Sequence, residues 1–167
     1  RSAHIYMENS VDYLHDVITQ NNIDCDYEQS GYLLVGTSPA QVKRVEHDFK
    51  IMDKWGLGGV ERWGRDRLAA EFNTDFYKLG WFEPRCGIVN PAKLSRGLKD
   101  LAESAGAVVY ENSPVVSFAR KGAASGFVVK TDRGEIHAEY LVLATNAYSI
   151  LFPQLKSLQF PAFTHIV

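Results

Sequence analysis

Apolar residues in the first half of the chain recur at helical spacing and alternate with short apolar strands. The stripe Met7, Val11, Leu14 and Ile18 predicts a helix that ends near residues 21–22. Residues 31–38 then read as a strand. The elements expected after it are a helix from Ser38, a strand at 60–64, a helix at 65–72 and a strand at 77–84.

Two of the predicted helices carry capping signals. Ser38-Pro39-Ala40-Gln41 places serine at the N-cap, proline at the first helical position and glutamine three residues after the cap. Asn90-Pro91 opens another helix, expected over 91–105, which Gly106 stops. Their apolar stripes are Val42, Val45, Phe49 and Met52 in the first, and Leu94, Leu98, Leu101 and Ala105 in the second.

After Gly106 the pattern changes to the period of two that is typical of strands. We expect strands 114–119, 126–131 and 135–138 to form an antiparallel ribbon. Residues 107–111 also read as a strand, and the apolar run at 140–144 returns to a buried sheet. The whole pattern predicts an α+β fold, a buried sheet plus an antiparallel β-ribbon.

Small and polar residues follow the densely apolar strand at 140–143. Ala144-Thr145-Asn146 come directly after it. Ligands of open α/β sheets bind beyond the carboxyl ends of such strands, where small residues let a ligand approach the backbone. The alternative is an ordinary strand exit followed by a helix N-cap, and this stretch alone does not decide between the two.

Composition and charge exclude several function classes. The 167 residues suit one domain or parts of two, and the formal net charge of −2 offers no general attraction to nucleic acid or anionic membranes. No apolar run reaches the length of a membrane span, and no signal-peptide pattern opens the chain. Cys25 and Cys86 lack metal-ligand spacing, as do the five histidines, so we expect no metal site. Reduced cysteines predict a cytoplasmic protein.

The run "CGIVNPAKLSRGLKDLAESAGAVVYENSPVVSF" and the later "VVKTDRGEIHAEYLVLATNAYS" resemble the D-amino-acid-oxidase-like superfamily of FAD-dependent oxidoreductases. Within it, "IDCDYEQSGYLLVGTSPAQ", "ATNAY" and "FPAFTHIV" are most similar to the γ-glutamylputrescine oxidase-like branch. The resemblance covers most of the chain, from about Ile23 to Val167. It rests on the order and spacing of several motifs rather than on one of them.

The resemblance implies a division into domain portions. Residues 1–26 would be a helical segment of the FAD-binding domain, and 27–85 a portion of an inserted substrate domain. Residues 86–150 would return to the FAD-binding domain and carry the β-ribbon at 112–138. In that domain the resemblance implies that strands 107–111 and 140–144 are neighbours in one buried sheet, with helix 91–105 packed against it. Residues 151–167 would begin a second substrate-domain portion.

The resemblance also assigns cofactor contacts. Val115 stands where the family's strand uses its backbone to contact the adenine of FAD. Ala144, Thr145 and Asn146 would lie beside the adenosine–pyrophosphate part. The superfamily usually has glycine at the position of Asn146, a mild departure because asparagine tolerates positive φ better than other non-glycine residues.

The glycine fingerprint of dinucleotide-binding proteins is missing from this sequence. Gly56, Gly58 and Gly59 lack the final glycine, the preceding strand and the following helix of GxGxxG. In the family this fingerprint lies upstream of the matching region. We therefore expect a central piece of a flavoenzyme, with FAD bound by the full-length parent and weakly or not at all by this chain.

Aromatic residues gather in the expected substrate-domain portion, and most are expected to be packing residues. Trp81 and Phe82 are the candidate exceptions, because adjacent strand residues face opposite sides and one of them can line an amine pocket. Arg85 can bind a substrate carboxylate bidentately, or it can be an exposed loop arginine. Asp66 and Glu71 lack the spacing of an acid–base pair, so no catalytic residue is assigned.

Two function hypotheses remain. In the first, the chain belongs to an FAD-dependent oxidoreductase that takes a hydride from an amine or amino acid onto flavin and leaves an imine. Its partners would be a small amine or amino-acid substrate and the remainder of the parent chain. In the second, the chain is a non-catalytic α+β ligand-binding or protein-interaction module.

Overall fold

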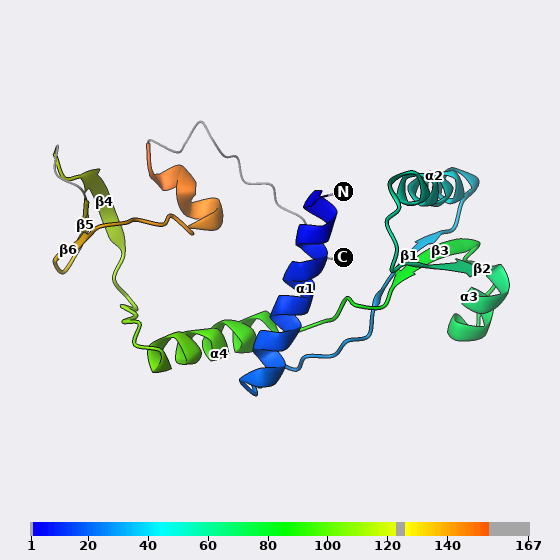
Figure 1. Ribbon diagram of the computed structural model, residues 1–167, viewed down its shortest axis with the longest axis horizontal. Coiled ribbons are helices and arrows are strands. Elements are labelled where there is room, and N and C mark those ends of the chain that lie inside the picture. Colours follow the sequence, from blue (N-terminus) through cyan, green and yellow to red (C-terminus); the bar gives the residue numbers. More distant parts are fainter. Residues whose placement is uncertain (1, 123–125, 154–167) are drawn as a thin grey trace. The chain divides into compact units, whose positions relative to one another are not determined.

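The computed structural model describes residues 2–122 and 126–153 (Figure 1). The chain divides into two compact units, Arg1–Val108 and Val109–Val167, and each is described by itself. The predicted strand pattern at 160–167, and most of the predicted portion 151–167, lie outside the described residues.

The first unit contains every helix and strand that the sequence predicts before residue 106. They are α1 (Ser2–Gln20), β1 (Tyr32–Gly36), α2 (Pro39–Trp55), β2 (Glu61–Gly64), α3 (Arg65–Phe72), β3 (Leu79–Glu83) and α4 (Pro91–Ser104). Their bounds agree with the predicted bounds to within a few residues. These elements were predictable because each has a local signal in the sequence, either a helical stripe, a cap or a short apolar run.

Helix α2 begins with the predicted capping box. The Ser38 hydroxyl oxygen accepts a hydrogen bond from the Gln41 backbone N–H at 3.3 Å, and the Gln41 side-chain oxygen accepts one from the Ser38 N–H at 3.1 Å. At its other end Gly56 adopts the left-handed conformation, with φ of 60°. Both ends of this helix are therefore specified by residues adjacent to it.

The sheet of the first unit is antiparallel and has the strand order β1-β3-β2. Its central strand is thus the last of the three in the sequence. Val45 of α2, Leu68 of α3 and Leu79 of β3 are each no more than 5% exposed and form the core around this sheet. Burial of these side chains is what holds the helices to the sheet.

The second unit is built on the predicted ribbon. It consists of β4 (Val115–Arg120), β5 (Phe127–Thr131) and β6 (Glu135–Ala138), antiparallel and in sequence order, followed by the 3-10 helix η1 (Asn146–Leu151). Val129 and Phe152 are buried, and the Phe152 ring lies 5.3 Å from that of Phe118. The antiparallel ribbon is confirmed.

The prediction that 107–111 and 140–144 are neighbours in one buried sheet is wrong for the described residues. Neither segment belongs to a strand. Val108 is 72% exposed and Val142 is 84% exposed, so these apolar runs are not buried within the described chain. The physical reason is that an apolar run signals a need for burial, while the strand that would pair with it is not specified by the run itself.

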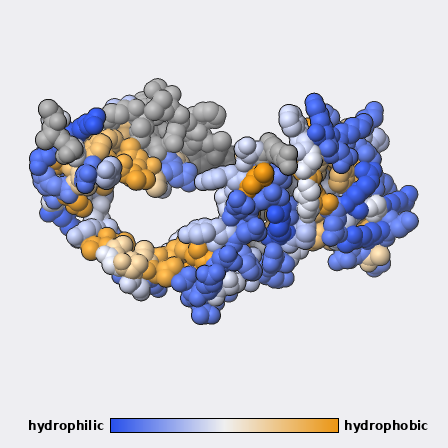
Figure 2. All heavy atoms as spheres, in the orientation of Figure 1, coloured by the Kyte–Doolittle hydropathy of each residue, from blue (hydrophilic) through white to orange (hydrophobic). Residues whose placement is uncertain are grey.

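Helix α4 shares this exposure. No residue of α4 is buried, although its apolar residues follow one stripe. Figure 2 shows apolar residues gathered along α4 and the segment that follows it. Among the described residues, no helix is long and apolar enough to cross a membrane, and no group of three or more His, Cys, Asp or Glu could hold a metal ion.

Candidate functional site

The register of the first sheet separates Trp81 from Phe82. Leu34 and Arg62 lie opposite Trp81 on the two neighbouring strands, while Leu33 and Glu61 lie opposite Phe82. Because side chains alternate along a strand, Trp81 and Phe82 point to opposite faces of the sheet. The two faces therefore have to be considered separately.

Helix α2 covers the face that carries Trp81. Arg62, on this face, pairs with Glu46 of α2 and lies over the ring of Phe49, 5.0 Å from its centroid. The Trp81 ring lies 5.5 Å from that of Tyr32, and its indole nitrogen is buried with no hydrogen-bond acceptor among the described residues. Trp81 thus lies beside the Tyr32 ring with one buried polar atom left without a partner among the described residues, and its substrate-binding role stays a prediction.

The opposite face carries Phe82 and an apolar surface that includes the buried Trp63. The Phe82 ring lies 4.7 Å from that of Trp63, and Leu33 and Val35 are half-buried on the same face. Arg67 of α3 lies over Trp63, 4.0 Å from its ring centroid, and pairs with Glu61. We call Leu33, Val35, Trp63 and Phe82 the Phe82 face. Trp81 and Phe82 are both half-buried, so burial does not decide between them, and the substrate-binding role of each stays a prediction.

Arg85 lies two residues after β3, in a turn, and it is not a fully exposed arginine. Its Nε donates to the Glu83 carboxylate at 3.1 Å, and its terminal Nη2 donates to Glu8 of α1. The side chain is 33% exposed. These two carboxylates hold the pKa of the guanidinium above its usual range. The substrate-carboxylate role of Arg85 stays a prediction, and two of its donors already have protein partners.

The candidate cofactor residues all lie in the second unit. Val115 begins β4, an edge strand of the ribbon, and pairs with Thr131; a register shift between Val115 and Ser117 follows. An edge strand presents backbone N–H and C=O groups on its outer side, as a backbone contact to adenine requires.

The segment 144–146 has the local geometry that the resemblance implies. Asn146 adopts φ of 46°, the left-handed conformation that glycine adopts most easily. Ala144 is exposed, and the Thr145 carbonyl accepts a hydrogen bond from the Tyr148 N–H at 3.0 Å in the first turn of η1. The helix start of the plainer reading is thus present here, but no strand precedes it directly in the described chain, and a cofactor contact stays a prediction.

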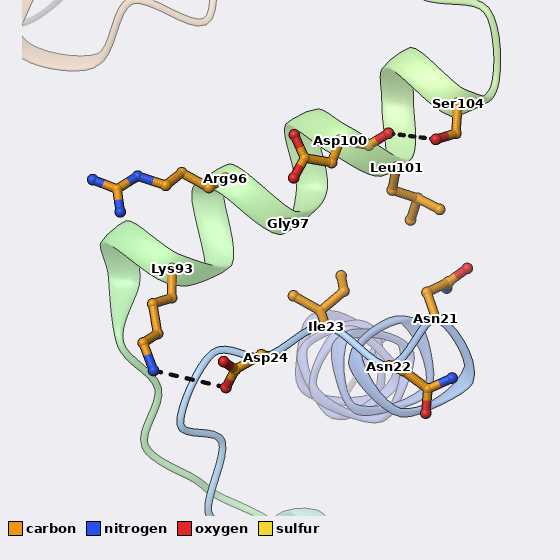
Figure 3. Close-up of a pocket in the computed structure, with 10 residues that line it drawn as sticks. All are labelled: Asn21, Asn22, Ile23, Asp24, Lys93, Arg96, Gly97, Asp100, Leu101 and Ser104. Carbon is orange, nitrogen blue, oxygen red and sulfur yellow. Dashed lines mark hydrogen bonds and ion pairs between the residues drawn. The ribbon is translucent and has the colours of Figure 1, made fainter.

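A groove of about 450 Å³ lies between α4 and the segment after α1 (Figure 3). Lys93 reaches toward Asp24, and the two charged groups are 3.7 Å apart. Gly97 faces Ile23 so closely that a methyl group on Gly97 would lie 2.3 Å from Ile23 Cγ2. The groove therefore marks where two segments of the unit pack together, through the close approach of Gly97 to Ile23 and the ion pair between Lys93 and Asp24.

The sequence did not indicate the contacts that join residues far apart along the chain. Glu8 lies 77 positions from Arg85, and the stripe of α1 drew attention only to its apolar residues. Ile23 and Gly97 also had no local signal, since a mid-helix glycine by itself indicates neither a partner nor its place. Trp63 was expected among the packing aromatics and is indeed buried.

Residues 3–167 match the family of FAD-dependent oxidoreductases known as DAO. The chain belongs to this family. It is 27% identical over 156 residues to gamma-glutamylputrescine oxidoreductase of Escherichia coli, covering 92% of this chain and 36% of that protein. It is 26% identical over 147 residues to the probable oxidoreductase OrdL of Haemophilus influenzae, covering 87% and 33%. The DAO chain thus spans about a third of the length of these relatives.

Solved structures agree with the DAO fold. L-proline dehydrogenase from P. horikoshii aligns with a TM-score of 0.75 at 20% identity, over 92% of this chain and 41% of that one. Glycine oxidase from Geobacillus kaustophilus aligns with a TM-score of 0.69 at 21% identity, over 89% and 39%. At such identities the likeness establishes the mixed helix-and-sheet fold and leaves the substrate open.

The DAO family implies FAD, and the residues present fit one end of that molecule. The edge strand at Val115 and the left-handed Asn146 suit backbone contacts to the adenosine side. The GxGxxG loop that would hold the pyrophosphate is absent from this sequence. The fit is therefore partial, and the binding of FAD by this chain alone stays a prediction.

Proposed function

We propose that the whole protein is an FAD-dependent oxidoreductase that oxidises a small amine or amino acid to the corresponding imine. FAD supplies the redox chemistry in this reaction, accepting the hydride from the carbon that bears the nitrogen. Membership of the DAO family and the names of its relatives support this reaction class.

The observation that carries the proposal is the apolar and aromatic Phe82 face of the β1-β3-β2 sheet, opposite α2. Leu33, Val35 and Phe82 are half-buried on this face, and Trp63 is buried. Amine pockets need apolar and aromatic walls with a few polar groups to fix orientation. We assign the wall role to Phe82, with Trp81 behind it as packing and Arg85 at the exit of the same strand.

The finer substrate class is also a proposal. Similarity to gamma-glutamylputrescine oxidoreductase favours a primary or secondary amine such as a γ-glutamylated polyamine over a simple amino acid. The cofactor role of Val115, Ala144, Thr145 and Asn146 belongs to the same proposal. Two free cysteines among the described residues support a cytoplasmic location.

The test is a flavin spectrum of the whole protein before and after anaerobic addition of amines. A panel of γ-glutamylated polyamines, unmodified polyamines, sarcosine and simple amino acids separates the substrate classes. We expect stoichiometric flavin absorbance that bleaches fastest with a γ-glutamylated amine. A protein without flavin, or flavin that no amine bleaches, would favour the non-catalytic binding module.

A further inference from the structure

Arg85, Glu8 and Glu83 form the least exposed set of ion pairs among the described residues. Their side chains are 33%, 24% and 17% exposed, whereas the pair Arg65–Asp75 is 56% and 83% exposed. The Arg85 backbone N–H also donates to the Glu83 carboxylate at 3.2 Å. The guanidinium is thus held by one carboxylate from the end of β3 and one from α1.

Helix α1 has few other attachments to its unit. Ile18 is its one buried residue, and apolar side chains of its first half, such as Tyr6 and Met7, are more than half exposed. Near its other end, His15 Nδ1 lies 3.1 Å from the Tyr27 hydroxyl. The Glu8–Arg85 pair therefore links the first half of α1 to the end of β3, where His4, Met7 and Val11 line a common pocket with Glu83 and Arg85.

The geometry of this link requires an arginine. Two different nitrogens, Nε and Nη2, reach two carboxylates that come from different elements. A lysine ammonium is a single point charge and does not reproduce this fork. The hydrogen bond from Arg85 also holds the pKa of Glu8 below its usual range, so the carboxylate is charged at neutral pH.

We propose that Arg85 is a positioning residue that fixes α1 to the end of β3 through Glu8 and Glu83. Phe82 lies in β3 next to Glu83, so the link also sets where the Phe82 face stands relative to α1. The effect of this link on catalysis rests on the proposed function, but its effect on the position of α1 does not. A role in binding a substrate carboxylate directly is the competing assignment.

The experiment compares Glu8→Gln, Arg85→Gln and Arg85→Lys in the whole protein, with Arg65→Gln as the matched control for a more exposed pair. Hydrogen exchange of the peptides covering α1 is measured first. We expect the amide exchange rate of α1 to rise roughly fivefold in all three variants and to stay unchanged in the control. A change of roughly fivefold corresponds to the upper range of the free energy that a partly exposed ion pair contributes. Unchanged α1 exchange in both Glu8→Gln and Arg85→Gln would overturn the proposal, whether or not the protein oxidises amines.

Steady-state kinetics then separate positioning from direct binding. Positioning predicts that Glu8→Gln and Arg85→Gln raise KM by a similar factor, again roughly fivefold, for amines with and without a carboxylate, at unchanged flavin content. A rise confined to Arg85→Gln and to carboxylate-bearing substrates would overturn positioning in favour of direct binding. A protein that oxidises no amine would refute the proposed function, and the exchange result would still decide the link.

Discussion

Replacing Gly97 by alanine tests the close approach of α4 to the segment after α1. An added Cβ would lie 2.3 Å from Ile23 Cγ2 and 3.4 Å from Ile23 Cβ. Carbon atoms at optimal separation are about 3.5–4.0 Å apart, so Ile23 would have to retreat by more than about 1 Å. The two segments are joined nearby by the Lys93–Asp24 ion pair, which opposes such a shift.

The expected magnitude follows from two opposing terms. Alanine is better than glycine in a helix interior by about 1 kcal/mol. Overpacking of this kind costs about 1–3 kcal/mol, so Gly97→Ala should destabilise the chain by about 1 kcal/mol net. In an Ile23→Ala background the clash is gone, and the same substitution should stabilise the chain by about 1 kcal/mol. The coupling between the two positions is then about 2 kcal/mol.

A double-mutant cycle measured by thermal or urea unfolding gives this coupling. Gly58→Ala is the matched control, since nothing lies within 4 Å of a Cβ added there and its φ is not positive. If Gly97→Ala has the same effect with and without Ile23, the contact between α4 and Ile23 does not exist as described.

Four further results are expected. Ser38→Ala should lower the free energy of unfolding by about 1 kcal/mol through loss of the α2 cap, as chemical denaturation would measure. Asn146→Gly should be close to neutral and Asn146→Ala should cost about 1 kcal/mol, because φ is 46° there; equal effects in unfolding experiments would contradict the left-handed conformation. The hydrogen bond from Lys93 lowers the pKa of the Asp26 carboxyl, so the pair stabilises the fold at neutral pH and loses this contribution as pH falls below about 4. The melting temperature of Lys93→Met should accordingly fall less steeply with acid than that of the unchanged chain. Trp81→Ala should lower stability by about 3 kcal/mol as a cavity beneath α2, and a melting temperature that does not move would refute its packing role.

Much of the fold was predictable because its signals are local. The capping box at Ser38, the glycine after α2 and the period of two in the ribbon each specify an element from adjacent residues. The alternation of Trp81 and Phe82 was predictable for the same reason. Which face α2 lies on was not predictable, because no residue near β3 indicates where that helix packs.

Interactions between distant residues were not predictable from the sequence. Nothing near Arg85 indicates that Glu8 is its partner, and nothing near Gly97 indicates Ile23. The apolar runs at 107–111 and 140–144 led to a wrong pairing, since hydrophobicity indicates burial without naming a partner. The backbone conformation of Asn146 was easier to predict, because asparagine accepts a positive φ more readily than other non-glycine residues.

The central claim is that β3 presents an amine-binding wall in an FAD-dependent oxidoreductase. Its most direct test is amine turnover by Phe82→Ala in the whole protein, beside flavin content and melting temperature, with Trp81→Ala as the matched aromatic control. We predict that kcat/KM falls about ten- to two-hundredfold in Phe82→Ala while flavin stays bound, as expected for a lost pocket contact. Unchanged kinetics in Phe82→Ala, with lost stability alone, would contradict the account.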